Sequence, residues 1–357
     1  MMLSLRLTKC RAEAAMWLLS LVMIQVVVAS GIAPWRIGIG QIARGADFHD
    51  PQADREALPQ VIPSTKGYEV MERDDRLVIR EGGEVIGEYV FGDAKILRPY
   101  FSNLLAPGRT QVTRNHPPRE GVDATDHESM HPGLWFGFGE LSGADFWRNG
   151  GRVRHVRFSE PPAVSADRVG FATLSRLETG TGEVIGQVEC RVAIRSLPQG
   201  RLIVWEATFS SEQGALVFGD QEEMGWGARV ATPLTEKNGG VIVSSSGVRT
   251  AAKSWGQSAD WCDYSGMIDG KGCGVTLMAG PDNFRPSWWH NRDYGVIVAN
   301  AFGRAAMKQG ERSEVKVAKG ERLRLVYGAM LHDGPGYDPP AAYRSFVEAT
   351  ALSKEGR

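Results

Sequence analysis

The sequence has few cysteines and no excess of either charge sign. Its 357 residues contain 4 Cys, 41 Lys plus Arg and 42 Asp plus Glu, for a formal net charge of −1. This balance argues against nucleic-acid binding through an overall basic surface and against an acidic solvating chain. Only Cys190, Cys262 and Cys273 follow the N-terminal segment, and no CxxC pattern occurs, which excludes a disulfide scaffold and a zinc ribbon. A bridge between Cys262 and Cys273, flanking one hairpin, stays open.

Long apolar runs are scarce as well, and the one near the N-terminus has a specific context. Lys9 and Arg11 precede an apolar stretch, Ala14–Ala29, which ends in small residues. This order is typical of a signal peptide cleaved near residues 29–33, with an uncleaved N-terminal anchor as the alternative. We therefore expect an exported protein, periplasmic or extracellular, that meets the membrane only through residues 1–30. No later stretch approaches the ~20 apolar residues of a spanning helix.

The rest of the chain shows the alternation of short β-strands. Gly (43) and Pro (18) supply many turns. Strands are predicted at residues 68–73, 76–80, 84–91, 152–160, 163–177, 184–196, 201–210, 240–246, 273–279, 294–300, 313–318 and 322–330. The spacing favours an all-β fold, a large antiparallel β-sandwich, in one domain over residues 66–350 after a linker or arm at 31–65. One C-terminal helix is expected after Asp338, with Phe346 on its buried face.

The segment from Tyr100 to Gly151 is dense in Asn, Arg, Asp, Gly and Trp and contains a long irregular insertion. Between residues 106 and 132, few apolar residues alternate. Four of the seven histidines fall in or just after this segment, namely His116, His127, His131 and His155. Because long loops in compact domains often carry function, this segment is a candidate site.

Three interpretations fit this loop. Aromatic faces beside Arg, Asn, Asp and His groups suit a sugar site, in which a neutral histidine serves as general acid or base. His116, His127 and His131, with Asp126 or Glu128, could instead hold a transition metal. The same polar groups could also serve only to satisfy the backbone of a long loop.

Three further clusters combine polar and aromatic residues, at 220–229, 261–266 and 286–295. The adjacent acids Glu222 and Glu223 cannot both point into one core, so one of them is expected to face solvent or a ligand. A solvated acidic turn is the alternative. The Trp-rich cluster at 286–295 could form a stacking wall for a ligand, or an aromatic plug that closes the end of the sandwich.

Together these clusters resemble a domain-of-unknown-function family that carries the label methane oxygenase PmoA. The likeness covers about residues 65–335 and rests on segments 100–103, 113–118, 126–127, 131–135, 145–147, 227–233, 261–264, 289–295 and 300–303. The resemblance implies an exported β-sandwich protein. An Asn–Arg segment followed by His-x-Gly-x-Trp is also similar in layout to the galactose mutarotase-like supersandwich.

The favoured interpretation is acid–base chemistry on a carbohydrate or sugar derivative, in a cleft where these clusters converge. His131 or His290 would move the proton, with Glu223 or Asp263 as the carboxylate partner. Contacts to a small-molecule or oligosaccharide substrate are expected from Arg114, Asn115, His116, His127, Trp135, Arg229, Tyr264, Trp289 and Arg292. No cofactor is predicted, and lyase, epimerase and hydrolase chemistry all stay open. The alternatives are a metal-dependent, oxygenase-type site at His116, His127, His131 and Glu128, and a glycan-binding protein without chemistry.

Overall fold

The computed structural model describes residues 61–63, 67–165 and 168–355, all within one compact unit, Ala57–Arg357. The expected signal peptide or anchor at residues 1–30 lies outside the described residues. The expected arm at 31–65 lies outside them as well, except for the strand β1 at Val61–Pro63. Among the helices that the structure describes, none has the length and apolar character needed to cross a membrane.

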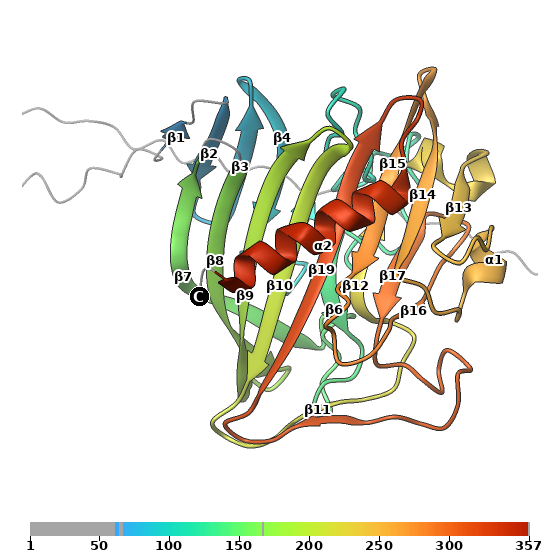
Figure 1. Cartoon of the computed structure of the whole chain (residues 1–357). Helices are drawn as coiled ribbons and strands as arrows, with labels where there is room; N and C mark the ends of the chain where they lie inside the picture. The colour runs from blue at the N-terminus through green and yellow to red at the C-terminus, as the bar shows by residue number, and fades with distance from the viewer. Residues whose placement is uncertain (1–60, 64–66, 166–167, 356–357) are drawn as a thin grey trace, which may run out of the picture. The chain divides into compact units, whose positions relative to one another are not determined.

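One sheet has nine strands in the order β1-β2-β3-β4-β5-β6-β12-β17-β16 (Figure 1). Its strands are β1, β2 (Tyr68–Glu72), β3 (Arg76–Glu81), β4 (Glu84–Val90), β5 (Tyr100–Ser102), β6 (Leu134–Phe138), β12 (Met224–Arg229), β16 (Trp288–Trp289) and β17 (Val296–Asn300). Its first six strands follow one another along the chain, whereas β12, β16 and β17 return from far away. The sheet therefore joins the three polar segments around residues 103–133, 220–229 and 286–295.

A second sheet has eight strands in the order β13-β14-β15-β19-β10-β9-β8-β7. These are β7 (Gly151–Val164), β8 (Arg168–Thr179), β9 (Val184–Leu197), β10 (Gly200–Ser210), β13 (Val241–Ser244), β14 (Trp261–Ile268), β15 (Lys271–Ala279) and β19 (Arg322–Asp333). The small elements are β11 (Leu216–Phe218), which pairs with β18 (Val315–Val317), the 3₁₀ turns η1 (Thr232–Leu234) and η2 (Glu236–Asn238), and the short helix α1 (Ala251–Ser254). Strand pairing in both large sheets is antiparallel.

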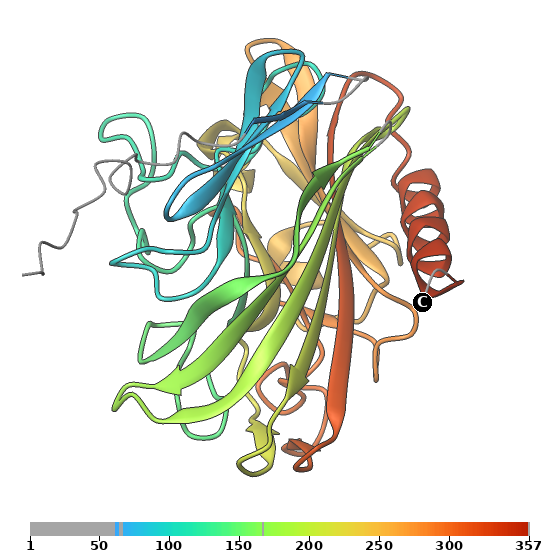
Figure 2. The same cartoon turned by 90° about the vertical axis from the view of Figure 1, so that its left-hand side faces the viewer.

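The main core lies between the two sheets (Figure 2). Trp205 of β10 contacts the rings of Tyr89, Phe136 and Trp226 from the other sheet, with centroids 5.0–5.6 Å apart. Along β9 every second side chain is buried, from Val188 to Ile194, as the alternation of the sequence predicts. Burying one such large apolar side chain contributes roughly 1.5–3 kcal/mol. The predicted antiparallel β-sandwich is confirmed.

The predicted C-terminal helix is also confirmed, as α2 (Pro339–Glu355). It crosses the outside of the eight-stranded sheet (Figure 1), where Phe346 and Ala342 are fully buried against Met278 and Met330. A Cβ on Gly328 of β19 would come within 2.6 Å of the Phe346 ring. The glycine therefore lets the helix approach the sheet closely.

The three cysteines after the N-terminal segment are buried and unpaired. Cys262 lies opposite Leu277 on neighbouring strands, and Cys273 lies opposite Gly266. The two thiols are four residue pairs apart along the β14–β15 hairpin, so the bridge left open between Cys262 and Cys273 does not form.

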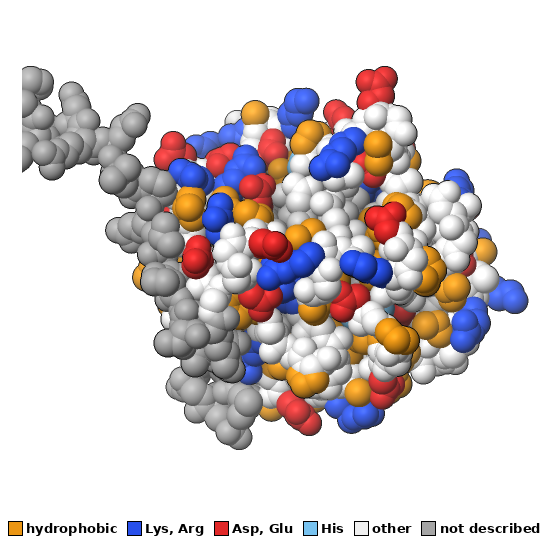
Figure 3. Space-filling model, turned by 90° about the horizontal axis from the view of Figure 1, so that it is seen from above, with side chains coloured by type: hydrophobic (Ala, Val, Ile, Leu, Met, Phe, Trp, Pro, Cys, Tyr) orange, Lys and Arg blue, Asp and Glu red, His pale blue; other side chains and the backbone are white. Residues whose placement is uncertain are grey.

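Charges of both signs are mixed on the described surface. Seen from above, Lys and Arg side chains alternate with Asp and Glu side chains over the visible face (Figure 3). This view shows no area of a single sign, so the described part of this face offers no field that would steer a strongly charged partner.

Candidate functional site

A row of paired residues crosses the outer face of the nine-stranded sheet, the face turned away from the core. Trp135 on β6 lies opposite Gly227 on β12, which in turn lies opposite Val298 on β17. His290, just after β16, exchanges two backbone hydrogen bonds with Val298, of 2.9 and 3.1 Å. Directly paired residues on neighbouring strands point to the same face. Trp135, Val298 and His290 therefore all rise from the outer face.

The outer face carries an apolar patch of its own, separate from the main core. Trp135 and Trp147 pack edge to face with ring centroids 5.5 Å apart, beside Val296 and Val298. A Cβ on Gly227 would lie 2.9 Å from the Trp135 ring, so the glycine leaves the space that the indole occupies. Both tryptophans are fully buried because the loop between β5 and β6 covers them.

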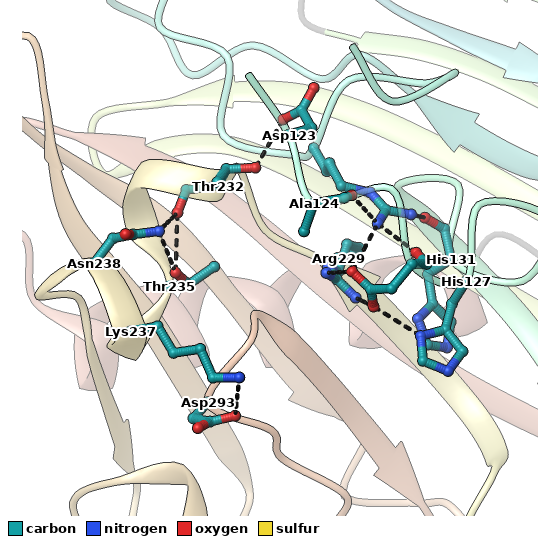
Figure 4. A network of polar contacts seen from close by, with 12 residues as sticks. Asp123, Ala124, His127, His131, Arg229, Thr232, Thr235, Lys237, Asn238 and Asp293 are labelled. Atoms are coloured by element: carbon teal, nitrogen blue, oxygen red, sulfur yellow. Dashed lines mark hydrogen bonds and ion pairs between the residues drawn. The ribbon is translucent and has the colours of Figure 1, made fainter. Parts of the chain in front are cut away.

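Two buried arginines hold that loop against the sheet (Figure 4). Arg229, the last residue of β12, donates through both terminal nitrogens to the Asp126 carboxylate at 2.9 and 2.8 Å. Arg114 donates to three backbone oxygens of the loop at 2.7–3.0 Å, those of Ala124, Asp126 and His131. Burial raises the pKa of Asp126, but hydrogen bonds from Arg229 and His127 outweigh burial and hold it well below its usual range. Asp126 is therefore ionised and fixed in place.

Four rings form a stack above the sheet, in the order Tyr294, His127, His131 and Trp135. Successive centroids are 6.1, 5.0 and 5.1 Å apart, with interplanar angles of 12°, 27° and 13°. His131 is 4% exposed, and its Nδ1 has no hydrogen-bond partner in the part of the chain described. Burial, and then the charge of Arg229, lower the pKa of His131 well below its ordinary value. His131 is thus a neutral imidazole near pH 7.

The stacking also bears on the metal alternative. The lone pair of a ring nitrogen lies in the plane of its ring, so stacked imidazoles such as His127 and His131 do not direct their lone pairs at one ion. Among the described residues, no three His, Cys, Asp or Glu side chains are arranged to hold a metal ion. The ligand set His116, His127, His131 and Glu128 therefore does not assemble.

A second group on the same face joins Glu222, His290 and Arg292. The Arg292 guanidinium donates to both carboxylate oxygens of Glu222 at 3.0 and 3.1 Å, and Nδ1 of His290 lies 3.5 Å from Glu222 Oε2. The contacts with His290 and Arg292 lower the pKa of Glu222 to about 2. Burial lowers the pKa of His290, although Glu222 opposes this. The group thus combines an ionised carboxylate with a neutral buried imidazole.

The two adjacent acids have different partners. Glu222 belongs to the group just described, whereas Glu223 forms an ion pair with Arg148, which also binds Asp145 at 2.9 Å. The next residue, Met224, is buried in the core between the sheets. Of these two acids the one beside His290 is therefore Glu222, whereas the predicted partner was its neighbour Glu223.

Three of the predicted site residues lie elsewhere. Asp263 is on the far side of the eight-stranded sheet, where it binds His332 Nε2 and the Thr276 hydroxyl at 2.8 and 2.7 Å. Tyr264 and Trp289 are fully buried in the core between the sheets. The reason is strand alternation, because successive side chains along a strand point to opposite faces of its sheet. The expectation that the clusters converge in one cleft is therefore wrong for Asp263.

Tyr264 and Trp289 nevertheless support the site from below. The Tyr264 hydroxyl donates to the Asp293 carbonyl oxygen at 3.0 Å and accepts from the Glu236 N–H at 2.8 Å. Trp289 donates through Nε1 to the Ala259 carbonyl oxygen at 2.9 Å. Both anchor the segment that carries His290 and Arg292.

Asn115 and His116 line a surface pocket beside the apolar patch of the outer face, with a volume of about 540 Å³. Asn115 accepts a hydrogen bond from Gln111 and donates to Asp123, at 3.0 and 2.8 Å. The His116 ring packs edge to face on Tyr100, with centroids 5.2 Å apart. Tyr100 belongs to the apolar patch of the outer face, so the pocket adjoins this patch.

The predicted site residues do not include several members of the ring stack, the apolar patch and the ion pairs described above, chiefly Glu222, Tyr294, Trp147 and Arg148. Glu222 carried a signal, since one of the adjacent acids Glu222 and Glu223 is expected from the sequence to face solvent or a ligand. Tyr294 and Trp147 lay in segments already marked as polar and aromatic. Their contacts to His127 and His131 come from distant elements, and no local pattern indicates which ring meets which.

Comparison with known protein families gives one match. Residues 76–343 match the profile of a family described as "Family of unknown function (DUF6807)". This overturns the sequence-based assignment, because the matching family carries no function and nothing in the match names PmoA or methane oxygenase. None of the curated proteins compared with the sequence matches it.

Solved structures show distant similarity. A galactose mutarotase related enzyme from Lactobacillus acidophilus is 12% identical, with a TM-score of 0.35, over 74% of this chain and 97% of that chain. An aldose epimerase homologue from C. elegans is 7% identical, with a TM-score of 0.32, over 76% and 98%. A TPR-domain containing protein from Parabacteroides distasonis is 10% identical, with a TM-score of 0.34, over 75% of this chain, which spans only 47% of that protein. At such TM-scores these matches carry no argument about the site.

Proposed function

The chain belongs to the family of unknown function DUF6807, and from its site we propose that it binds a carbohydrate on the outer face of the nine-stranded sheet and transfers a proton on that sugar. The observation that carries the proposal is the group of Glu222, His290 and Arg292. It pairs an ionised carboxylate with a neutral buried imidazole, and an arginine holds the carboxylate. Neighbouring titratable groups whose pKa values are both shifted by burial and by a charged partner are typical of functional sites.

The chemistry follows from the two nitrogens of His290. Nδ1 faces Glu222 Oε2 at 3.5 Å without a hydrogen bond in this structure, and the carboxylate would orient the ring and accept the Nδ1–H once this contact shortens. Nε2 then carries the lone pair and takes a proton from a sugar hydroxyl or from a carbon next to a carbonyl. Contacts of 3.5 Å in a free enzyme tighten when substrate binds. The His290 imidazolium that results, beside the Glu222 carboxylate, then returns the proton from Nε2 to the sugar.

Arg292 and the aromatic residues beside it would orient the substrate. Arg292 keeps donors beyond those used by Glu222, and guanidinium groups bind oxygen atoms in fixed directions. Its guanidinium carbon lies 6.0 Å from the centre of the Trp255 ring, which restricts its movement. Tyr294 and the partly exposed His127 present ring edges and faces beside it.

The test is a Glu222→Gln variant, which keeps the shape of the side chain and removes its charge. Proton NMR of a panel of monosaccharides and oligosaccharides follows anomer exchange, elimination and bond cleavage. With the sugar that the wild type converts, we expect kcat to fall about 100- to 10,000-fold and KM to change only a few-fold, because the carboxylate acts on the proton transfer.

The matched control is Glu128→Gln, the same change at an exposed acid of the β5–β6 loop. It should keep the wild-type rate. Equal rates in the Glu222→Gln variant and the wild type would refute the acid–base assignment. Sugar binding without conversion of any sugar would replace it with the glycan-binding alternative.

We further propose that residues 1–30 export the protein to the periplasm or the outside of the cell. The support is the basic residues Lys9 and Arg11 before the apolar stretch, and the small residues at its end. Extracellular carbohydrates would then be the accessible substrates.

A further inference from the structure

The His116 pocket, the cavity lined by Asn115 and His116, lies on the same face of the sheet as the proposed site. Val85 of β4 and Leu105 line it, and both alternate with residues of the main core, Ile86 and Leu104. Strand alternation therefore places Val85 and Leu105 on the outer face. Its volume of about 540 Å³ falls within the usual range of small-molecule sites, roughly 300–1,000 Å³.

The lining of the pocket offers polar groups that the protein leaves unused. Gln111 donates through Nε2 to Thr113 and Asn115, which leaves its Oε1 as a free acceptor. The His116 Nδ1 is buried and has no partner within the described ranges. No hydrogen bond or ion pair of the described part of the chain holds the Arg119 guanidinium. The Gln111 amide and the Arg119 cation thus line the pocket together with Pro117 and Pro118, while the His116 Nδ1 lies buried beneath the surface.

These unused groups stand on a rigid frame. Asn103 accepts from the His116 N–H at 3.0 Å and donates to the His116 carbonyl oxygen at 3.3 Å. Asn115 is fixed between Gln111 and Asp123. A frame of this kind presents hydrogen-bonding groups at set positions, as recognition of sugar hydroxyls requires.

The pocket and the Glu222 group lie on the same face of the sheet, at either side of the β5–β6 loop segment that buries Trp135, so a ligand that reaches both would pass over this loop. The line from Tyr100, on which His116 packs, to His290 crosses β6, β12 and β17. Four strand spacings of ~4.8 Å amount to about 19 Å. One pyranose ring is much shorter than this distance.

We propose that the His116 pocket is a second carbohydrate subsite, so that the natural ligand is an oligosaccharide that reaches from this pocket to the Glu222 group. The inference rests on the proposed function and specifies the size of its substrate. Hydroxyl groups of one sugar unit would bind Gln111 and Arg119, while another unit reaches His290.

The experiment measures affinity against chain length by isothermal titration calorimetry. The probes are glucose, xylose and mannose, each with its β-1,4-linked disaccharide, tetrasaccharide and hexasaccharide. For one of the three series we expect the wild type to bind the tetrasaccharide at least about tenfold more tightly than the monosaccharide, since a second subsite adds contacts.

Two pocket variants and one matched control test whether the pocket causes the increase of affinity with saccharide length. Val85→Trp fills the pocket, and Arg119→Ala removes a side chain that has no described partner. Both should lose the gain with length and keep the monosaccharide affinity of the wild type. Val122→Trp places the same bulk at a residue that is 63% exposed and does not line the pocket, and it should keep the gain.

The outcomes separate the two proposals. Affinity that does not rise with length, or a gain that survives in Val85→Trp, overturns the second subsite and leaves the proposed function standing if the monosaccharide still binds. A rate loss in Glu222→Gln reports on the proposed function independently of the pocket. Absence of binding to every saccharide overturns both.

Discussion

His131 shows how the site keeps a histidine neutral. It lies among positive groups, Arg229, Arg98 and Arg114, and is shielded from water by the ring stack. Desolvation and like charge both penalise the imidazolium, so the folded protein takes up no proton there at mildly acidic pH. The unfolded chain does take one up, near pH 6.5.

A pH prediction follows at this residue. Because the folded-state pKa of His131 lies below the unfolded one, the unfolded state binds more protons below about pH 6.5, and the free energy of unfolding falls as pH falls. The contribution of one such group approaches at most about 1.4 kcal/mol per pH unit. In a His131→Phe variant, which keeps a ring in the stack, the loss of stability between pH 7 and pH 5 should be smaller than in the wild type. Urea unfolding at both pH values measures it.

Other groups do not obscure this comparison. His116, His155 and His290 also have lowered pKa values and are present in both proteins. Glu222 and Asp126 have folded-state pKa values below their ordinary values of 4.5 and 3.8, so their stabilising contributions are lost only as the pH falls below those values. Identical pH dependence in His131→Phe and the wild type would show that His131 takes up a proton while folded.

Among the secondary-structure elements, β12 sets the distance between the sheet and the ring of Trp135. Its Gly227 lies under Trp135, and Trp135 in turn supports His131. A methyl group at residue 227 would lie 2.9 Å from the indole and 3.2 Å from Val298 Cγ2. Neither a buried indole nor a core valine moves without disturbing its neighbours.

Gly227→Ala should therefore destabilise the protein by about 1–3 kcal/mol, through overpacking. For a domain of this size, each kcal/mol lowers Tm by roughly 2–4 °C. Thermal unfolding followed by near-UV circular dichroism measures the shift and reports on the indole environment at the same time.

Gly214→Ala is the matched control, because nothing lies within 4 Å of its added Cβ. Both substitutions reduce the flexibility of the unfolded chain equally, so this effect cancels in the comparison. A Gly227→Ala protein as stable as the Gly214→Ala protein would mean that Trp135 shifts freely and is not fixed by β12.

For the whole molecule, the sandwich brings together chain segments that lie far apart in sequence. The β5–β6 loop, the start of β12 and the turn before β17 meet on one face, while α2 covers the opposite outside face. One outer face is thus covered by a helix, and the other carries the ring stack, the Glu222 group and the His116 pocket.

The proposed export also concerns the whole chain. Expressed with a C-terminal tag in a Gram-negative host, the full chain should appear in the periplasmic fraction, with a new N-terminus near residues 29–33. A chain that begins after residue 30 should stay in the cytosol. Recovery of the uncleaved chain with the membrane would support the anchor alternative, and recovery of the full chain in the cytosol would refute export.

The sequence by itself determined the class of the fold. Alternation of apolar residues and turn signals are local, so most of the longer strands and the helix α2 could be recognised without knowledge of their partners. Strands β5, β6, β12, β14 and β16 were not predicted, since they lie in or beside the polar and aromatic segments. For the same reason the polar loop between β5 and β6 and the clusters around residues 222 and 290 stood out. The structure places Arg229, His131 and His290, three of the predicted site residues, on the outer face of the nine-stranded sheet, and their roles stay predictions.

Only the tertiary structure decided which of these residues meet. Alternation shows that Asp263 and Tyr264 face opposite ways, but not which face is the core or which sheet the strand joins, because that depends on pairing with distant strands. The choice of Glu222 over Glu223 likewise depends on His290 and Arg148, which come from other segments. The ring stack and the His116 pocket exist only where β5, β6, β12 and β17 lie side by side, since contacts between distant residues leave no local pattern in the sequence.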